Sequence, residues 1–263
     1  MDHLRIAIAT TGLAATLRES IDRAAQSGAH GVQFDVRSEV AADQFGATAC
    51  QQLRHLAQEH GLDIASATFP LRRPLYDPVE LDGRVHVVRE AIKLCGRLKC
   101  RTLTLRIGRI PEEQDAPARV RLLGALSDLA RVGAQEGVTP AISTSGDSPS
   151  ELARLVEEVK DGPVGIDLDP AGCISTQLAP VTVLRSLHES MLHVQGRDAV
   201  RDLETGAREV PLGRGETPWD ELLATLADCR YRGWITIRRT TGSDRLLESA
   251  NAVRYLRTVA QGG

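Results

Sequence analysis

The chain alternates short runs of β-branched and apolar residues with longer segments whose apolar positions recur at helical spacing. The short runs predict eight strands, at residues 5–9, 32–36, 64–68, 102–105, 139–142, 164–168, 191–194 and 234–237. The weakest helical pattern between them lies around residues 180–187. Because parallel strands need long crossover connections, strands that alternate with helices indicate an α/β fold with a parallel sheet.

The spacing of these runs favours a closed barrel. Units of roughly thirty residues follow one another without a linker or a change in composition, which fits a barrel better than an open doubly wound sheet. No Gly-x-Gly-x-x-Gly follows the first strand, so a dinucleotide site lacks support. We therefore predict a single-domain (β/α)8 TIM barrel over residues 1–263.

Local signals mark several helix ends. Ser148 and Glu151 have the spacing of an N-terminal capping box. Glycines just before four of the strands predict helix exits through a left-handed residue, at Gly28, Gly61, Gly137 and Gly233.

Composition excludes several classes of protein. With 42% hydrophobic residues the chain is too apolar for disorder, and it has no apolar run near the ~18 residues of a membrane span. A net charge of -3 and 3% aromatic residues offer little to a nucleic acid. The five cysteines form no Cys-x-x-Cys pair, and no signal-like segment opens the chain. We expect a cytoplasmic protein that binds neither nucleic acid nor membrane.

Side chains of a barrel strand point alternately inward and outward, and the chemistry of such barrels lies where the strands end. Apolar residues such as Leu103, Ile166 and Val194 are expected to face the helices. Their neighbours then bring polar side chains to the barrel mouth, namely Asp35, Arg106, Ser143, Asp169, Gln195 and Arg238. Asp167 and His193 are expected one layer deeper.

Two interpretations of this cluster stay open. Charges held partly out of water must be paired, so the residues can form a self-neutralising network that fills the barrel. Alternatively, they bind a ligand. The second interpretation gains support from further arginines beyond the strand ends or in the loop after the seventh strand, at positions 37, 72, 73, 109, 197, 214 and 239. Arginine holds phosphate and carboxylate groups through paired hydrogen bonds, which indicates an anionic ligand.

Four segments resemble the xylose-isomerase-like barrels, the sugar phosphate isomerase/epimerase group: VGIDLDP (164–170), LHVQGRDAV (192–200), EVPLGRGETPWDELLATL (209–226) and YRGWITIRR (231–239). GAHGVQFDV and the rhythm of the first half match as well, so the resemblance covers essentially the whole chain. It implies an isomerase or epimerase in which a divalent metal ion bridges two substrate oxygens.

The metal ligands that the resemblance implies are a Glu ending the fifth strand, an Asp ending the sixth, a His on the seventh and a Glu on the eighth. The corresponding residues here are Ser143, Asp169, Gln195 and Arg238, and Gly172 stands where many relatives carry a histidine. A divalent ion needs several anionic or strongly donating ligands. We therefore predict no metal or other cofactor, loss of the metal-dependent isomerisation, and an ion pair between Arg238 and Asp169.

The preferred hypothesis is a barrel that binds a small anionic sugar-type ligand through Asp35, Arg106, Ser143, Gln195, Arg197 and Arg238. The alternative is an active isomerase or epimerase with a metal-free acid/base pair of Asp169 and His193, although a lone histidine in a barrel is more often a hydrogen-bonded core group. An endonuclease would need several metal ligands that are missing here. A filled mouth that binds nothing is the remaining hypothesis, and a homodimer is the default assembly.

Overall fold

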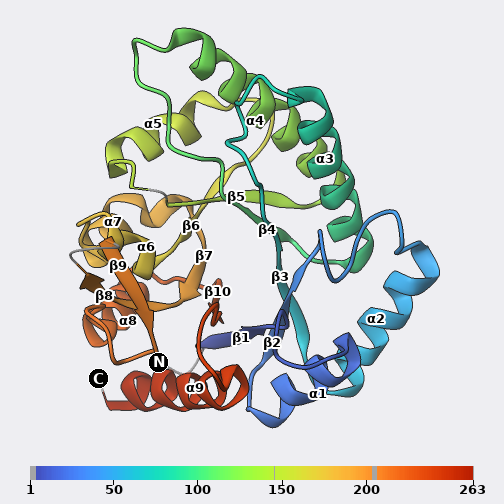
Figure 1. The fold of residues 1–263 in the computed structure, drawn as a ribbon, viewed down its shortest axis with the longest axis vertical. Helices are drawn as coiled ribbons and strands as arrows, with labels where there is room; N and C mark the ends of the chain where they lie inside the picture. The colour runs from blue at the N-terminus through green and yellow to red at the C-terminus, as the bar shows by residue number, and fades with distance from the viewer. Residues whose placement is uncertain (1–3, 145, 203–205, 263) are drawn as a thin grey trace.

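The computed structural model describes residues 4–144, 146–202 and 206–262, and in it eight parallel strands close into a barrel (Figure 1). Around the barrel the strand order is β1-β10-β7-β6-β5-β4-β3-β2. The strands are β1 (Arg5–Ala9), β2 (Gly31–Asp35), β3 (Asp63–Phe69), β4 (Thr102–Leu105), β5 (Thr139–Ser143), β6 (Gly165–Leu168), β7 (Met191–Gly196) and β10 (Trp234–Ile237). All eight predicted strands are confirmed, with ends displaced by at most two residues.

Helices connect the strands and surround the barrel (Figure 1). They are α1 (Leu17–Gln26), α2 (Ala47–Glu59), α3 (Leu81–Leu98), α4 (Ala116–Glu136), α5 (Pro149–Glu158), α6 (Pro170–Ser175), α7 (Pro180–Leu187), α8 (Trp219–Asp228) and α9 (Arg245–Gly262), with a 3-10 turn at His188–Ser190. Within the described residues, none of these helices combines the length and apolarity needed to cross a membrane.

The apolar core lies between the strands and the helices. Ile166, Leu168 and Val194 face outward as predicted, are 0% exposed, and belong to one cluster with helix residues such as Leu184 and Leu222. Each such side chain stabilises the fold by roughly 1.5–3 kcal/mol when it leaves water. Because this outer layer supplies the core, the inward positions can carry polar groups.

The predicted helix ends are confirmed with one exception. Ser148 and Glu151 form the capping box at the start of α5. Left-handed glycines follow three helices, with φ of 79°, 69° and 69° at Gly28, Gly61 and Gly137. The same prediction for Gly233 is wrong, because the chain leaves α8 through Arg230, whose φ is 53°.

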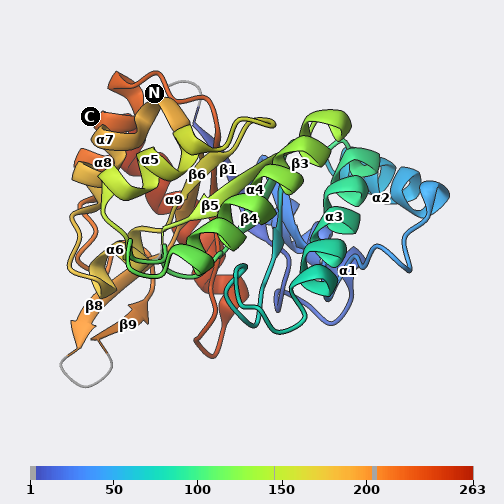
Figure 2. The same cartoon turned by 90° about the horizontal axis from the view of Figure 1, so that it is seen from above.

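A hairpin after β7 was not predicted. Its strands, β8 (Asp198–Asp202) and β9 (Gly206–Val210), pair antiparallel and extend away from the barrel beside α6 (Figure 2). Ala199 and Ala207 of the hairpin pack against Ala171 and Ile174 of α6. This contact area is small and made mostly of alanine, so the sequence contains no strong apolar alternation to reveal it.

Candidate functional site

A buried hydrogen-bond network centred on Asp167 of β6 lies below the barrel mouth. Asp167 Oδ1 accepts a hydrogen bond from His193 Nδ1 at 2.7 Å, and Oδ2 accepts from Ser143 Oγ at 2.5 Å and Gln195 Nε2 at 2.6 Å. The sheet register places Ser143 and His193 directly beside Asp167 on the neighbouring strands. Asp167 is 0% exposed, and a carboxylate so far from water requires these donors.

The other ring nitrogen of His193 is also occupied. Its Nε2 lies 2.7 Å from Thr236 Oγ1 and 3.1 Å from Ser66 Oγ, which accepts a hydrogen bond from Gln33 Nε2 at 2.8 Å. The distances from Ser66 through His193 to Asp167 are those of a catalytic serine triad. All three residues are at most 1% exposed, so no substrate reaches the serine, and the network serves to fill the barrel.

A chain of alternating charges lies nearer the surface. Arg197 Nη1 donates to Asp169 Oδ2 at 2.6 Å, and Arg197 Nη2 donates to Glu209 Oε2 of the hairpin at 3.2 Å. Arg239 Nη1 donates to Glu209 Oε1 at 2.7 Å, and its Nε to Glu248 Oε2 at 2.5 Å. These bonds join the ends of β6, β7 and β10 to the hairpin and to α9.

Burial alone would raise the pKa of Glu209 and lower the pKa of Arg197, but their partners reverse both effects. Hydrogen bonds from Thr240 and the charges of Arg197 and Arg239 hold the pKa of Glu209 below its ordinary value. The charges of Asp169 and Glu209 raise the pKa of Arg197. Both shifts favour the charged forms of Glu209 and Arg197.

The predicted ion pair between Arg238 and Asp169 is wrong, because Arg197 takes that place. Arg197 reaches Asp169 from the residue directly after β7, where it is also held by the hairpin carboxylate. Arg238 is half-buried and Arg106 is exposed, and neither forms an ion pair or a side-chain hydrogen bond within the described residues. Among residues 4–144, 146–202 and 206–262, the guanidinium groups of Arg106 and Arg238 thus have no compensating carboxylate.

The remaining predicted site residues have mixed surroundings. Asp35 is 6% exposed, and its Oδ1 accepts the backbone N–H groups of Arg37 at 2.8 Å and Ser38 at 3.1 Å. Its carboxylate therefore closes the turn after β2. Ser143 and Gln195 both donate to Asp167, so the structure brings them together with His193. His193 and Asp169, proposed as a catalytic pair, bond to different partners.

Sequence reasoning missed Asp198, which organises the loop beyond the hairpin. It is 1% exposed and accepts five hydrogen bonds, from the backbone N–H groups of Ala199, Gly213, Gly215 and Thr217 and from Trp219 Nε1. A signal was present, because Asp198 lies two residues beyond β7 and the later Gly213-x-Gly215 stretch leaves backbone N–H groups that an aspartate is suited to accept. These contacts connect the end of β7 to the start of α8.

The residues present do not fit the divalent ion that the resemblance implies. Of the four carried-over positions only Asp169 offers a carboxylate, and its Oδ2 is already bonded to a guanidinium. In the described part of the chain, no three His, Cys, Asp or Glu side chains converge in a geometry that could hold a metal ion. An arginine beside the single carboxylate also opposes a cation by charge.

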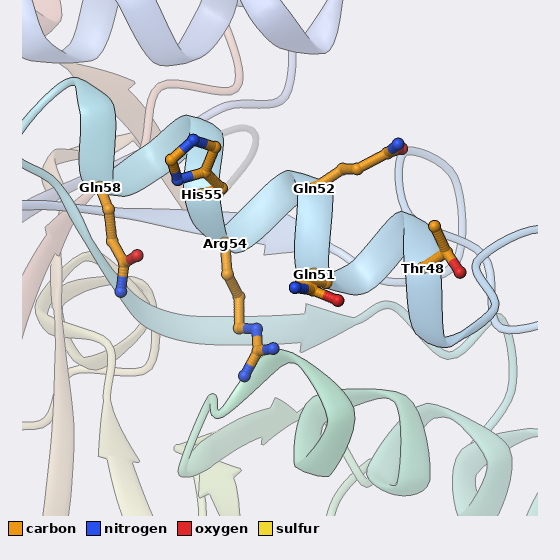
Figure 3. A pocket seen from close by; sticks show the side chains of 6 residues that line it. All are labelled: Thr48, Gln51, Gln52, Arg54, His55 and Gln58. Carbon is orange, nitrogen blue, oxygen red and sulfur yellow. The ribbon is translucent and has the colours of Figure 1, made fainter.

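The hollows outside the barrel mouth differ in character. One of about 650 Å³ runs along α2, where Figure 3 shows polar side chains projecting from a single helix, including Gln51, His55 and Gln58. Another of about 600 Å³ has Tyr76 and Arg109 on its walls, in the loops after β3 and β4. The first lies on the flank of the protein and is unrelated to the strand ends.

Comparison with known proteins agrees with this architecture. Residues 21–259 match the family described as Xylose isomerase-like TIM barrel. No curated protein sequence matches the chain significantly.

Solved structures give the same result for the fold. A xylose isomerase domain protein from Planctomyces limnophilus is 21% identical, with a TM-score of 0.85, and 99% of this chain and 97% of that one are covered. A D-allulose 3-epimerase from Methylomonas sp., solved with D-allulose, is 15% identical at a TM-score of 0.78, with 97% of both chains covered. For a 3-keto-D-glucoside 4-epimerase from E. coli, identity is 13%, the TM-score is 0.77, and 97% of this chain and 99% of that one are covered. At such identities the likeness concerns the fold alone, but the family match spans most of the sequence, and the chain therefore belongs to the xylose isomerase-like TIM barrel family.

Proposed function

We propose that this barrel binds a small anionic, sugar-type ligand at its C-terminal face, with Arg106 and Arg238 holding the anionic group. The observation that carries the proposal is the charge left over at the mouth. Arg197 already neutralises Asp169, whereas Arg106 and Arg238 lack an ion-pair partner within the described residues. A phosphate or a carboxylate is the group that guanidinium donors bind best.

The ion pair at the mouth also has unused hydrogen-bonding capacity. Asp169 Oδ1 and Arg197 Nε are both buried and have no hydrogen-bond partner among the residues that the structure describes. One is an acceptor and the other a donor, and a sugar hydroxyl can both donate and accept. Both atoms have almost no solvent-accessible surface, so a hydroxyl group reaches them only when the ion pair between Arg197 and Asp169 opens. We assign hydroxyl recognition to these two atoms in that state, assisted by Gln195 and Asp35, while Ser143 holds Asp167 beneath them.

We further propose that the metal-dependent isomerisation of the family is lost in this protein. Asp169 is the single carboxylate among the four expected ligands, and Arg197 occupies it. Elemental analysis of the purified protein, followed by titration with manganese, tests this proposal. No stoichiometric divalent ion is expected; a tightly held ion that Asp169→Asn releases would overturn it.

The alternative of a metal-free acid/base pair receives no support from the geometry. His193 is 1% exposed and both of its ring nitrogens are engaged. We expect no deuterium from solvent to enter a sugar substrate in the presence of a chelator. Chelator-resistant exchange that Asp169→Asn abolishes would favour the alternative instead.

For the chain as a whole we propose one domain over residues 1–263, acting in the reducing cytoplasm, in line with its five unpaired cysteines.

Thermal unfolding in the presence of ligands tests the anion site. Glucose phosphate and gluconate are the probes, each compared with glucose. An anion at about a hundred times its Kd would stabilise the fold by about 2.7 kcal/mol, which is a shift of roughly 5 °C for a chain of this size. We expect this shift in the natural protein, and none from glucose at the same concentration.

Matched variants locate the effect. Arg238→Ala should abolish the shift, and Arg106→Ala should reduce it. Arg232→Ala is the control, because Arg232 is also exposed and precedes β10, at the opposite end of the barrel. The proposal fails if neither anion shifts the unfolding temperature, or if the shift survives unchanged in Arg238→Ala.

A further inference from the structure

A larger cavity than these two hollows, of about 1310 Å³, lies outside the barrel wall between α3 and the loops that follow β2 and β3. Side chains alternate along a strand, so the alternation that turns Asp35 to the mouth turns Val36 and Phe69 outward. Val36 and Phe69 form the floor of this cavity, together with other apolar side chains from the two loops, Ala41, Ala42 and Leu71. The cavity is therefore separate from the barrel mouth.

One face of α3 forms the opposite wall. Gly83, Arg84, Val87 and Glu90 line it at helical spacing, while the residues that pack on the barrel, such as Val88, lie on another face. Val87 is 46% exposed and adds apolar surface to this wall. A Cβ atom placed on Gly83 would meet no atom within 4 Å, so the space in front of this glycine is open.

The rim of the cavity is basic. Arg84 donates to the carbonyl oxygens of a neighbouring loop, at 3.2 Å to Pro74, 2.5 Å to Asp77 and 2.7 Å to Val79. Carbonyl groups fix the position of this guanidinium but do not cancel its charge. Arg37 is held in the same way, by Pro70 O at 2.6 Å.

Other charges around the cavity leave a positive excess. Arg72 is exposed and forms no ion pair or hydrogen bond in the described part of the chain. Arg73 pairs with Asp77 at 3.2 Å, and Glu90 pairs with Lys93 at 2.7 Å. The lining thus has three arginines, at positions 37, 72 and 84, and two carboxylates without an ion-pair partner among the described residues, Asp43 and Glu80.

We propose that this cavity is a binding site for a small amphipathic anion, with its apolar body on the Val36 and Phe69 floor and its carboxylate or phosphate at Arg72 and Arg37. An apolar floor with a few charged groups at its edge is the usual composition of a small-molecule site. The volume accommodates a ligand of ordinary metabolite size. The site does not depend on the barrel mouth, so either proposal can fail without the other.

Fluorescence titration of the full chain with anilinonaphthalene sulfonate tests the site, with the uncharged phenylnaphthylamine as the matched probe. The sulfonate is expected to bind more tightly than its neutral counterpart. Arg72→Ala should weaken the sulfonate by about threefold, the scale of one exposed ion pair, and leave the neutral probe unchanged. Phenylbutyrate should displace the sulfonate at lower concentration than phenylbutanol does.

A plug variant tests the location. Methionine suits a helix better than glycine, so the fold should persist in Gly83→Met. Because the new side chain fills the open space, sulfonate binding should weaken by about tenfold or more. The controls are Gly124→Met and Arg18→Ala, and both should change affinity little. Gly124 lies on the exposed surface of α4, where a Cβ also meets nothing within 4 Å, and Arg18 is exposed as well. Unchanged affinity in Gly83→Met, or an equal effect of Gly124→Met, would overturn the proposal.

Discussion

Replacing Asp198 with asparagine tests whether one buried carboxylate organises the loop between the hairpin and α8. Its Oδ1 accepts two N–H groups and its Oδ2 accepts three. Asparagine keeps one oxygen, and its amino group cannot accept a hydrogen bond. In one orientation two buried donors lose their acceptor, and in the other one buried and two partly buried donors lose it.

The expected loss of stability follows from this count. A buried donor without an acceptor costs about 1–3 kcal/mol, so Asp198→Asn should lower the free energy of unfolding by about 2–6 kcal/mol. Natural domains are stable by only about 5–15 kcal/mol. The loss corresponds to a fall of roughly 4–12 °C in Tm for a chain of this length.

Urea unfolding followed by tryptophan fluorescence measures the loss, and Trp219 itself donates to Asp198 at 3.3 Å. Asp161→Asn is the matched control, since Asp161 is exposed and forms no hydrogen bond or ion pair in the described residues. The reasoning is refuted if Asp198→Asn costs no more than about 0.5 kcal/mol, the usual range of a surface substitution, and so cannot be told from Asp161→Asn.

Three further predictions concern the same region and its surroundings. Gly215→Ala should destabilise the protein by about 1–3 kcal/mol, because its Cβ would lie 2.1 Å from Asp198 Oδ1. Urea midpoints of Gly215→Ala, Asp198→Asn and the double variant should show that the two effects do not add. The fold lowers the pKa of Glu209 below 4.5, so its contribution to stability is complete above that pH and is lost as pH falls through the lowered value. Glu209→Gln should therefore flatten the fall in unfolding free energy below pH 4.5, and an unchanged acid profile would contradict this. Burial and the nearby Asp169 charge raise the pKa of Cys173 to about 12. Half-buried Cys229 should therefore react with Ellman's reagent before Cys173 at neutral pH, and equal labelling of the two cysteines in mass spectra would contradict this.

The sequence alone determined the barrel and the direction of its strand side chains. Alternation along a strand is a local property, so it placed Asp167 and His193 inside and Ile166 and Val194 outside without knowledge of any long-range contact. The eight strands were recognised for the same reason, since each burial pattern lies within a few consecutive residues.

The tertiary structure alone decided which charges meet. Arg238 was the predicted partner of Asp169, but Arg197 forms the ion pair, and this outcome depended on the hairpin, whose Glu209 supports Arg197 from the other side. The role of Asp198 likewise depends on donors up to 21 residues away along the chain. Distances between residues remote in sequence depend on how loops close, which no local periodicity encodes, and so the partners of the mouth arginines could be read only from the folded chain.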